Sequence, residues 1–269
     1  LVSKQFIACF GDAFKAAGRT GNAAVEFITL PEGQGARLSQ ADCDRIDCAF
    51  IDRDLRFSEQ LYAACVDAAL ASKSLEWLHS ASSGVWQQKF MHPVAERVGV
   101  NTGSSGSNGV PVAKTGFAGL LMLARGFYGY MRGQHNHQWQ PLRGDALPPD
   151  LRGQTLLLIG VGAIGKVFAS YARAFGLKVI GVRRSPLEAG DPVDEMHPPS
   201  KLPGLWPRAD WIVLTCPLTN ETRNLVNADA FKRMRKGAKL INIARGEVVD
   251  EAALIEAIQS GKLGGAALD

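Results

Sequence analysis

The sequence predicts an α/β protein in which a Rossmann-type, doubly wound parallel sheet follows a smaller α/β domain. Two observations carry this prediction. From Leu151 onward four short apolar runs recur, with helical stretches between the first two and the last two: "TLLLIG", "KVIGV", "WIVLTCP" and "KLINIA". A glycine-rich segment, 160–165, directly follows the first run. Continuous apolar strands joined by helical crossovers indicate a parallel sheet that is covered on both faces.

The composition argues against several classes of protein. The 30 Lys and Arg are scattered among 26 Asp and Glu, which leaves a net charge of +4, and no nucleic-acid partner is expected. Five cysteines without a CxxC pair are typical of a reducing compartment and argue against disulfides or a zinc site. His135 and His137 are more typical of solvated side chains than of metal ligands, so no metal is expected.

No membrane partner is expected either. The longest apolar run, 116–131, is interrupted by Arg125 and is too short to span a bilayer. The chain starts at Leu1 without the pattern of a secretory signal. We therefore expect a cytoplasmic protein, with an organelle left open as an alternative.

The first half of the chain carries a weaker α/β signal. Segments 45–52 and 74–80 are predicted to be short strands, and 58–70 between them has apolar residues at helical spacing. The Gly- and Ser-rich segment 101–109 predicts a loop that acts as a hinge or belongs to an active site.

Two domains follow from these patterns. A helix is predicted over 112–131, and one more short strand is predicted at 264–269. We expect a substrate domain at 1–107 and a dinucleotide-binding Rossmann domain at 108–269, with a cleft between them.

The segment 160–165 matches the pattern GxGxxG. The pattern alone is weak evidence, but here it follows a strand, opens a helix and precedes a second strand. Gly160 would allow the tight turn, Gly162 would let the backbone approach a pyrophosphate, and Gly165 would let the helix pack against the strand. The N–H groups at the helix start would then bind phosphate. The predicted cofactor-binding residues are Gly160, Gly162, Ala163, Ile164 and Gly165; the alternative is a glycine-rich turn without a ligand.

Two arginines occupy the place where an acidic residue would hold the cofactor's ribose. That residue belongs at the end of the second strand, roughly 20 residues on, and the sequence there is Arg183-Arg184-Ser185. The planar guanidinium matches a 2′-phosphate, which a carboxylate would repel. The sequence therefore predicts that NADP(H) is preferred and that NAD(H) is possible. The alternative is a pair of solvated arginines with relaxed cofactor choice.

The second half of the chain resembles the D-isomer-specific 2-hydroxyacid dehydrogenases. The stretches that carry the resemblance are "LRGQTLLLIGVGAIGKVFASYARAFGLKVIG", "ADWIVLTCPLTNETRNLVN" and "MRKGAKLINIARGEVVDEAALIEAIQSGKLGGAALD". The first half is similar more loosely, at "SLEWLHSASSGV" and "NGVPVAK". Within the family, "VRRSP" is most similar to the glyoxylate/hydroxypyruvate reductases. The resemblance implies a flavodoxin-like substrate domain and reduction of a small 2-keto acid to a D-2-hydroxy acid.

The resemblance also implies site residues. Arg245 falls on the family's catalytic arginine, which would hold the substrate carboxylate and polarise the keto oxygen. Ser83 and Gly84 match a loop whose N–H groups bind the carboxylate, although an ordinary turn is the alternative. The implied cofactor contacts are Thr215, Cys216, Pro217, Ile243, Ala244 and Asp269. We interpret Cys216 as a small buried residue, not as a nucleophile.

Other features leave alternatives open. In the family, the proton-donating His and its Glu partner lie beyond the position of Asp269, so we expect a truncated or partial chain that is inactive alone. Lys114 and Trp86 depart from the family's pattern and put the identity of the substrate in doubt. The family includes transcriptional corepressors, so an inert cofactor-binding module is the alternative from another class, and an NAD-using dehydrogenase of other specificity is a nearer one. A homodimer is expected.

Overall fold

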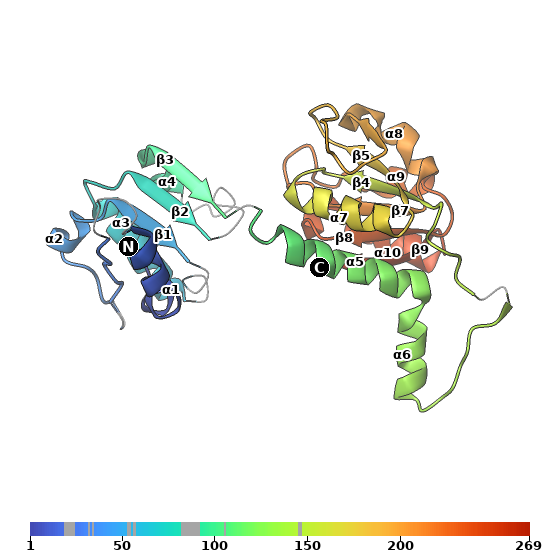
Figure 1. Cartoon of the computed structure of the whole chain (residues 1–269), viewed down its shortest axis with the longest axis horizontal. Helices are drawn as coiled ribbons and strands as arrows, with labels where there is room; N and C mark the ends of the chain where they lie inside the picture. Colours follow the sequence, from blue (N-terminus) through green and yellow to red (C-terminus); the bar gives the residue numbers. More distant parts are fainter. Residues whose placement is uncertain are drawn as a thin grey trace. The chain divides into compact units, whose positions relative to one another are not determined.

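The computed structural model divides the chain into two compact units, Leu1–Ser107 and Asn108–Asp269 (Figure 1). It describes all residues except 19–24, 32, 34, 53–54, 56–57, 82–91, 105 and 145–146. Each unit has a parallel sheet and a hydrophobic core of its own. The predicted fold class is therefore confirmed.

The second unit is built on a six-stranded sheet with the order β6-β5-β4-β7-β8-β9. All neighbouring strands are parallel. The strands are β4 (Thr155–Ile159), β5 (Lys178–Val182), β6 (Glu195–His197), β7 (Trp211–Leu214), β8 (Ala238–Asn242) and β9 (Leu263–Leu268). Strand order reverses between β4 and β7, and doubly wound sheets bind ligands at the carboxyl ends of the strands at such a point.

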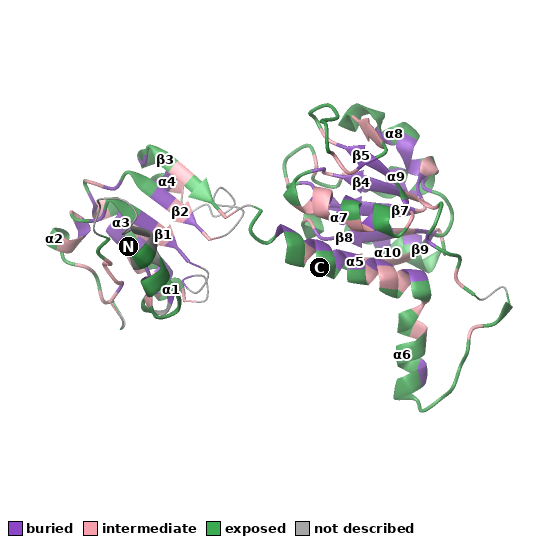
Figure 2. Ribbon diagram, viewed as in Figure 1, coloured by how far each residue is buried: buried purple, intermediate pink, exposed green. Residues whose placement is uncertain are grey.

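Helices cover both faces of this sheet, as the continuous apolar strands predict (Figures 1 and 2). One face packs against α5 (Gly109–Arg125) and α7 (Ala163–Ala174). The other packs against α8 (Leu202–Leu205), α9 (Ala228–Arg233) and α10 (Glu251–Gln259). Consecutive strand residues serve opposite cores: Leu156 and Leu158 belong to the first, and Leu157 to the second.

The first unit has a three-stranded parallel sheet in the described part of the chain, with the order β1-β2-β3. Its strands are β1 (Cys48–Ile51), β2 (Trp77–Ser80) and β3 (Val100–Gly103). Its helices are α1 (Lys4–Gly18), α2 (Gln40–Cys43), α3 (Glu59–Ala71) and α4 (His92–Arg97). The prediction of a loop over 101–109 is wrong at its start, because residues 101–103 pair with β2.

The single helix predicted over 112–131 is also wrong. The structure has two helices, α5 and α6 (Phe127–His135), which meet at Gly126. Gly126 has φ +67°, a left-handed conformation that glycine adopts without strain and that commonly ends helices. Helix α6 and the segment after it project from the body of the second unit (Figure 1). Among the described residues, no helix is long and apolar enough to cross a bilayer.

Candidate functional site

Gly160 and Gly165 shape the loop between β4 and α7. Gly160 has φ +100°, and a Cβ there would lie 2.5 Å from the backbone nitrogen of Cys216. A Cβ on Gly165 would lie 2.2 Å from the carbonyl oxygen of Gly160. Both distances are too short for a real side chain, so the tight turn and the close packing of α7 need glycine at both positions. These are the roles that the sequence predicts for them.

Gly162 differs because the space beside it is open. No heavy atom lies within 4 Å of the position that a Cβ would take. Gly162 is also the N-cap of α7 and supplies no side-chain acceptor to the helix start. The N–H groups of a helix's first turn have no partner within the helix and favour an anion. The loop therefore fits a dinucleotide pyrophosphate, for which Ala163 and Ile164 would supply further N–H groups.

The turn after β7 contacts the glycine loop and is bound to it by hydrogen bonds. The Thr215 N–H donates to the Ile159 carbonyl at 2.9 Å, and its hydroxyl donates to the carbonyl of Gly160. Cys216 is buried, and burial raises the pKa of its thiol to about 11. A thiol that stays protonated at neutral pH is a poor nucleophile, in agreement with its predicted packing role. Pro217 is exposed at the end of this turn.

Arg183 follows β5, as predicted, but its guanidinium is bound within its own loop. It pairs with both carboxylate oxygens of Asp191, at 2.7 and 3.2 Å, and its Nε donates to the carbonyl of Ser185 at 3.1 Å. Its side chain is 10% exposed and that of Asp191 is 0% exposed. Arg183 is therefore held in place before any ligand binds.

Asp191 organises this loop, which we call the ribose loop (residues 183–191). Its carboxylate accepts the Glu188 N–H at 2.8 Å and lies 3.0 Å from Nζ of Lys166, on α7. The Glu188 N–H, Lys166 and Arg183 lower the pKa of Asp191 to about 2. The carboxylate is thus ionised throughout the neutral range.

Arg184 is exposed, and its side chain makes no hydrogen bond or ion pair with any residue that the structure describes. Ser185 is exposed beside it. The structure therefore separates two arginines that the sequence presents as a pair. Arg183 is a fixed part of the ribose loop, whereas the exposed side chain of Arg184 is able to contact a ligand.

Arg245 lies in the turn after β8. It is exposed, and its Nη1 donates to the carbonyl of Ala244 at 2.7 Å. The buried Asn242 shapes this turn: its Nδ2 donates to the carbonyl of Arg245 at 2.9 Å, and its Oδ1 accepts from the Ala244 N–H at 3.0 Å. Ile243 points into the core, so a cofactor contact there would come from its backbone.

The ends of neighbouring strands bring these predicted residues to one edge of the sheet. Gly160, Arg183, Thr215, Arg245 and Asp269 follow β4, β5, β7, β8 and β9 in turn. Asp269 donates its N–H to the carbonyl of Asn242 at 3.0 Å, and both line a cavity of about 660 Å³. Ser83 and Gly84 lie outside the described residues.

Sequence reasoning missed four residues that shape this edge: Lys166, Glu188, Asp191 and Asn242. Asn242 had a usable signal, because it is a polar residue at the end of an apolar strand. The other three had none, since ion pairs between a loop and a helix follow no periodic pattern.

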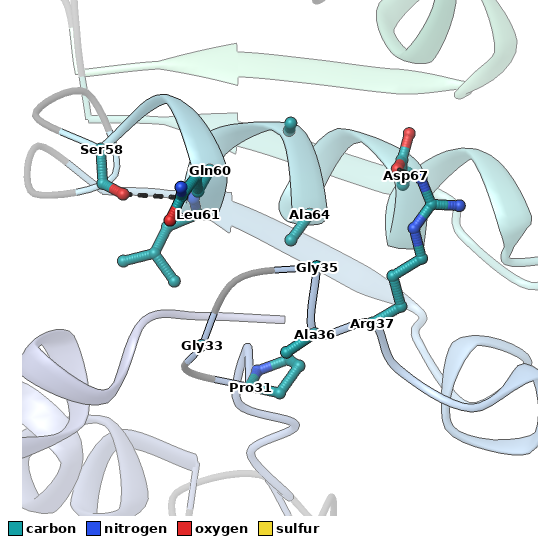
Figure 3. Close-up of a pocket in the computed structure, with 11 residues that line it drawn as sticks. Pro31, Gly33, Gly35, Ala36, Arg37, Ser58, Gln60, Leu61, Ala64 and Asp67 are labelled. Carbon is teal, nitrogen blue, oxygen red and sulfur yellow. Dashed lines mark hydrogen bonds and ion pairs between the residues drawn. The ribbon is translucent and has the colours of Figure 1, made fainter.

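The first unit has a surface pocket of about 400 Å³, which is lined by α3 and by Pro31, Gly33 and residues 35–37 (Figure 3). Arg37 and Asp67 form an ion pair across it at 3.0 Å, and their side chains are 75% and 46% exposed. None of the predicted site residues lines this pocket. In the described part of the chain, no group of three or more His, Cys, Asp or Glu could hold a metal ion.

Taken together, the glycine loop, the helix start and the strand ends define a dinucleotide-binding domain of the Rossmann class. A model of the family described as "D-isomer specific 2-hydroxyacid dehydrogenase, NAD binding domain" matches residues 117–269. The chain therefore belongs to the D-isomer specific 2-hydroxyacid dehydrogenase family, as the resemblance implied.

Curated proteins that are similar to this chain are named for different substrates. The chain is 38% identical over 164 residues to a glyoxylate reductase of Pyrococcus horikoshii, covering 58% of this chain and 48% of the relative. It is 32% identical over 205 residues to a D-3-phosphoglycerate dehydrogenase of Rattus norvegicus, covering 76% and 37%. The chain thus spans about half the length, or less, of these two relatives.

Solved structures of the family are also similar. One is a D-isomer specific 2-hydroxyacid dehydrogenase from Xanthobacter autotrophicus in complex with NADPH, with TM-score 0.73, 26% identity, and coverage of 96% of this chain and 76% of that one. Another is an NADPH-dependent glyoxylate/hydroxypyruvate reductase from Sinorhizobium meliloti in complex with NADP, with TM-score 0.69, 26% identity, and coverage of 84% and 67%.

Proposed function

We propose that this protein is an NADP(H)-dependent reductase that transfers hydride to the carbonyl carbon of a small 2-keto acid, giving a D-2-hydroxy acid. Glyoxylate and hydroxypyruvate are the proposed substrates. The observation that carries the proposal is the placement of the glycine loop, Arg184 and Arg245 at one edge of the sheet in a chain of this family. The D-3-phosphoglycerate dehydrogenase relatives make an NAD-using enzyme of other specificity the alternative.

Arg184 supports the choice of NADP(H). Its exposed guanidinium follows the strand that ends at the ribose position, and no described residue competes for it. A charge-assisted hydrogen bond contributes about 1.5–3 kcal/mol. At about 1.4 kcal/mol per factor of ten, one such bond to a 2′-phosphate would favour NADPH over NADH by about tenfold or more. Solved relatives named as complexes with NADPH or NADP add support.

Arg245 would act on the substrate. Its guanidinium can bind a carboxylate through two hydrogen bonds and stabilise the negative charge that grows on the keto oxygen. The bound dinucleotide would supply the hydride. We propose the first unit as the substrate domain, with the N–H groups of Ser83 and Gly84 as further carboxylate donors. We propose that a His donates the proton and that a Glu is its partner, as the resemblance implies.

A homodimer is part of the proposal. Helix α6 and residues 136–144, which we call the arm, carry large exposed apolar side chains: Phe127, Tyr128, Tyr130, Met131 and Trp139. Trp139 is 91% exposed. Exposed aromatic patches of this kind are typical of protein–protein contacts. We therefore propose that a second copy of the chain covers the arm.

Turnover by the full-length protein tests the proposed reaction. We expect NADPH oxidation with glyoxylate and hydroxypyruvate, and slower turnover of 3-phosphohydroxypyruvate. Arg245→Ala should raise KM and lower kcat together, because the arginine would contact both the bound carboxylate and the transition-state oxygen. NADPH affinity should change less than twofold, and Arg233→Ala, which alters an exposed arginine on α9, is the control. Near wild-type turnover by Arg245→Ala would contradict the assignment.

A further inference from the structure

The ribose loop brings two carboxylates close to the end of β5. The residues that directly follow β5 in the sequence are not acidic. Arg183 fills the position that an acidic residue occupies in NAD-binding relatives of this fold, yet Glu188 and Asp191 both pair with its guanidinium. The two carboxylates differ in access to solvent. Asp191 is 0% exposed, whereas the side chain of Glu188 is 59% exposed.

Glu188 is held at this place from two sides. One carboxylate oxygen lies 3.2 Å from Nη2 of Arg183, and the other lies 3.8 Å from Nζ of Lys166 on α7. Its backbone is fixed as well, since its N–H donates to Asp191 and its carbonyl accepts the Asp191 N–H at 3.1 Å. The carboxylate therefore has a defined position between the strand that ends at the ribose and the helix that begins at the phosphates.

We propose that Glu188 is a specificity-determining residue of the dinucleotide site. Its carboxylate accepts a hydrogen bond from the ribose 2′-hydroxyl of NAD(H) and repels the 2′-phosphate of NADP(H). Glu188 therefore reduces the preference for NADP(H) that Arg184 creates. The inference rests on the proposed function, because it assumes that a dinucleotide ribose lies at the end of β5.

The charges of the ribose loop explain the direction of this effect. Lys166 and Arg183 pair with the carboxylates of Glu188 and Asp191, so these four charges cancel and the exposed Arg184 adds one net positive charge. Asp191 is 0% exposed, and its charge is compensated by Lys166 and Arg183, with which it pairs. The side chain of Glu188 is 59% exposed, so its charge would oppose a phosphate group that bound at the end of β5. Its carboxylate is also a charged hydrogen-bond acceptor for a free 2′-hydroxyl.

The test compares Glu188→Gln and Glu188→Ala with wild type, using fluorescence titration of NADPH and NADH at one fixed ionic strength. Loss of the charge removes repulsion of the 2′-phosphate, and loss of the carboxylate weakens the bond to the 2′-hydroxyl. Both effects raise the ratio of the NADH Kd to the NADPH Kd, by at least about fivefold. The control is Glu256→Gln, which removes an exposed carboxylate from α10 and should leave the ratio unchanged. Thermal unfolding should show equal stability in all four proteins.

An unchanged ratio in both Glu188 variants, or a ratio that falls, overturns the inference. An equal shift in Glu256→Gln also overturns it, because general electrostatics would then be the cause. Failure of the proposed function can be told apart from failure of this inference. A ratio of the NADH Kd to the NADPH Kd at or below one in wild type contradicts only the proposed preference for NADP(H). The change of that ratio in the Glu188 variants still tests the role of Glu188. If neither dinucleotide binds, both proposals fail.

Discussion

At the scale of single residues, the glycine loop was predictable and the ribose loop was not. The positions of Gly160, Gly162 and Gly165 follow from a fixed spacing, because backbone approach and positive φ depend on local geometry. Arg183 was also placed correctly at the end of β5. Its partner Asp191 lies eight residues further along a loop, and such side-chain pairing leaves no periodic signal in a sequence.

Alanine at two of these glycines should separate ligand binding from folding. Gly162→Ala adds a Cβ to open space, so the thermal midpoint should stay near wild type. The same Cβ would occupy space that the pyrophosphate needs, and NADPH affinity should fall at least tenfold. Gly165→Ala places a Cβ 2.2 Å from the Gly160 carbonyl oxygen. We expect that overpacking to cost about 1–3 kcal/mol of stability.

Thermal unfolding and NADPH titration of both variants provide the measurement. The account is contradicted if Gly162→Ala binds NADPH as tightly as wild type, or if Gly165→Ala is as stable as wild type. Gly204→Ala is a suitable control, because its Cβ would also enter open space but lies on α8, away from the loop.

At the scale of helices and strands, long apolar patterns were predictable and short polar elements were not. The runs at β4, β5, β7 and β8 are apolar on both faces, so length and composition identify them as central strands. Strand β6 was missed because it has three residues, "EMH", at the sheet edge. The helix break at Gly126 was missed because a single glycine within an apolar run is compatible with either a continuous helix or an end.

The arm carries several large exposed apolar side chains, and we propose that a second copy of the chain covers them. Trp139→Ser removes its most exposed aromatic side chain, and apolar burial contributes about 25 cal/mol per Å². We expect wild type to be a dimer by light scattering after size exclusion, and Trp139→Ser to dissociate at least tenfold more readily. Leu187→Ser, which removes an exposed leucine from the ribose loop, should not change the dimer. A monomeric wild type, or an unaffected dimer in Trp139→Ser, would contradict this arrangement.

At the scale of the whole molecule, the family was predictable and its detailed activity was not. The family model matches residues 117–269, which include "LLLIGVGAIG" and "NIARG", the stretches on which the resemblance depends. The curated relatives that the chain matches include proteins named for glyoxylate and for D-3-phosphoglycerate. The proposed carboxylate loop, at Ser83 and Gly84, lies outside the described residues, so the structure does not add to the choice of substrate.

We propose that the edge formed by the loops after β4 and β5 binds a dinucleotide and favours its 2′-phosphate. The decisive experiment is titration of the purified chain with NADPH and NADH, followed by cofactor fluorescence. We expect that both bind and that NADPH binds about tenfold or more tightly, because Arg184 is exposed to meet the phosphate. Equal affinities, or tighter binding of NADH, would contradict it.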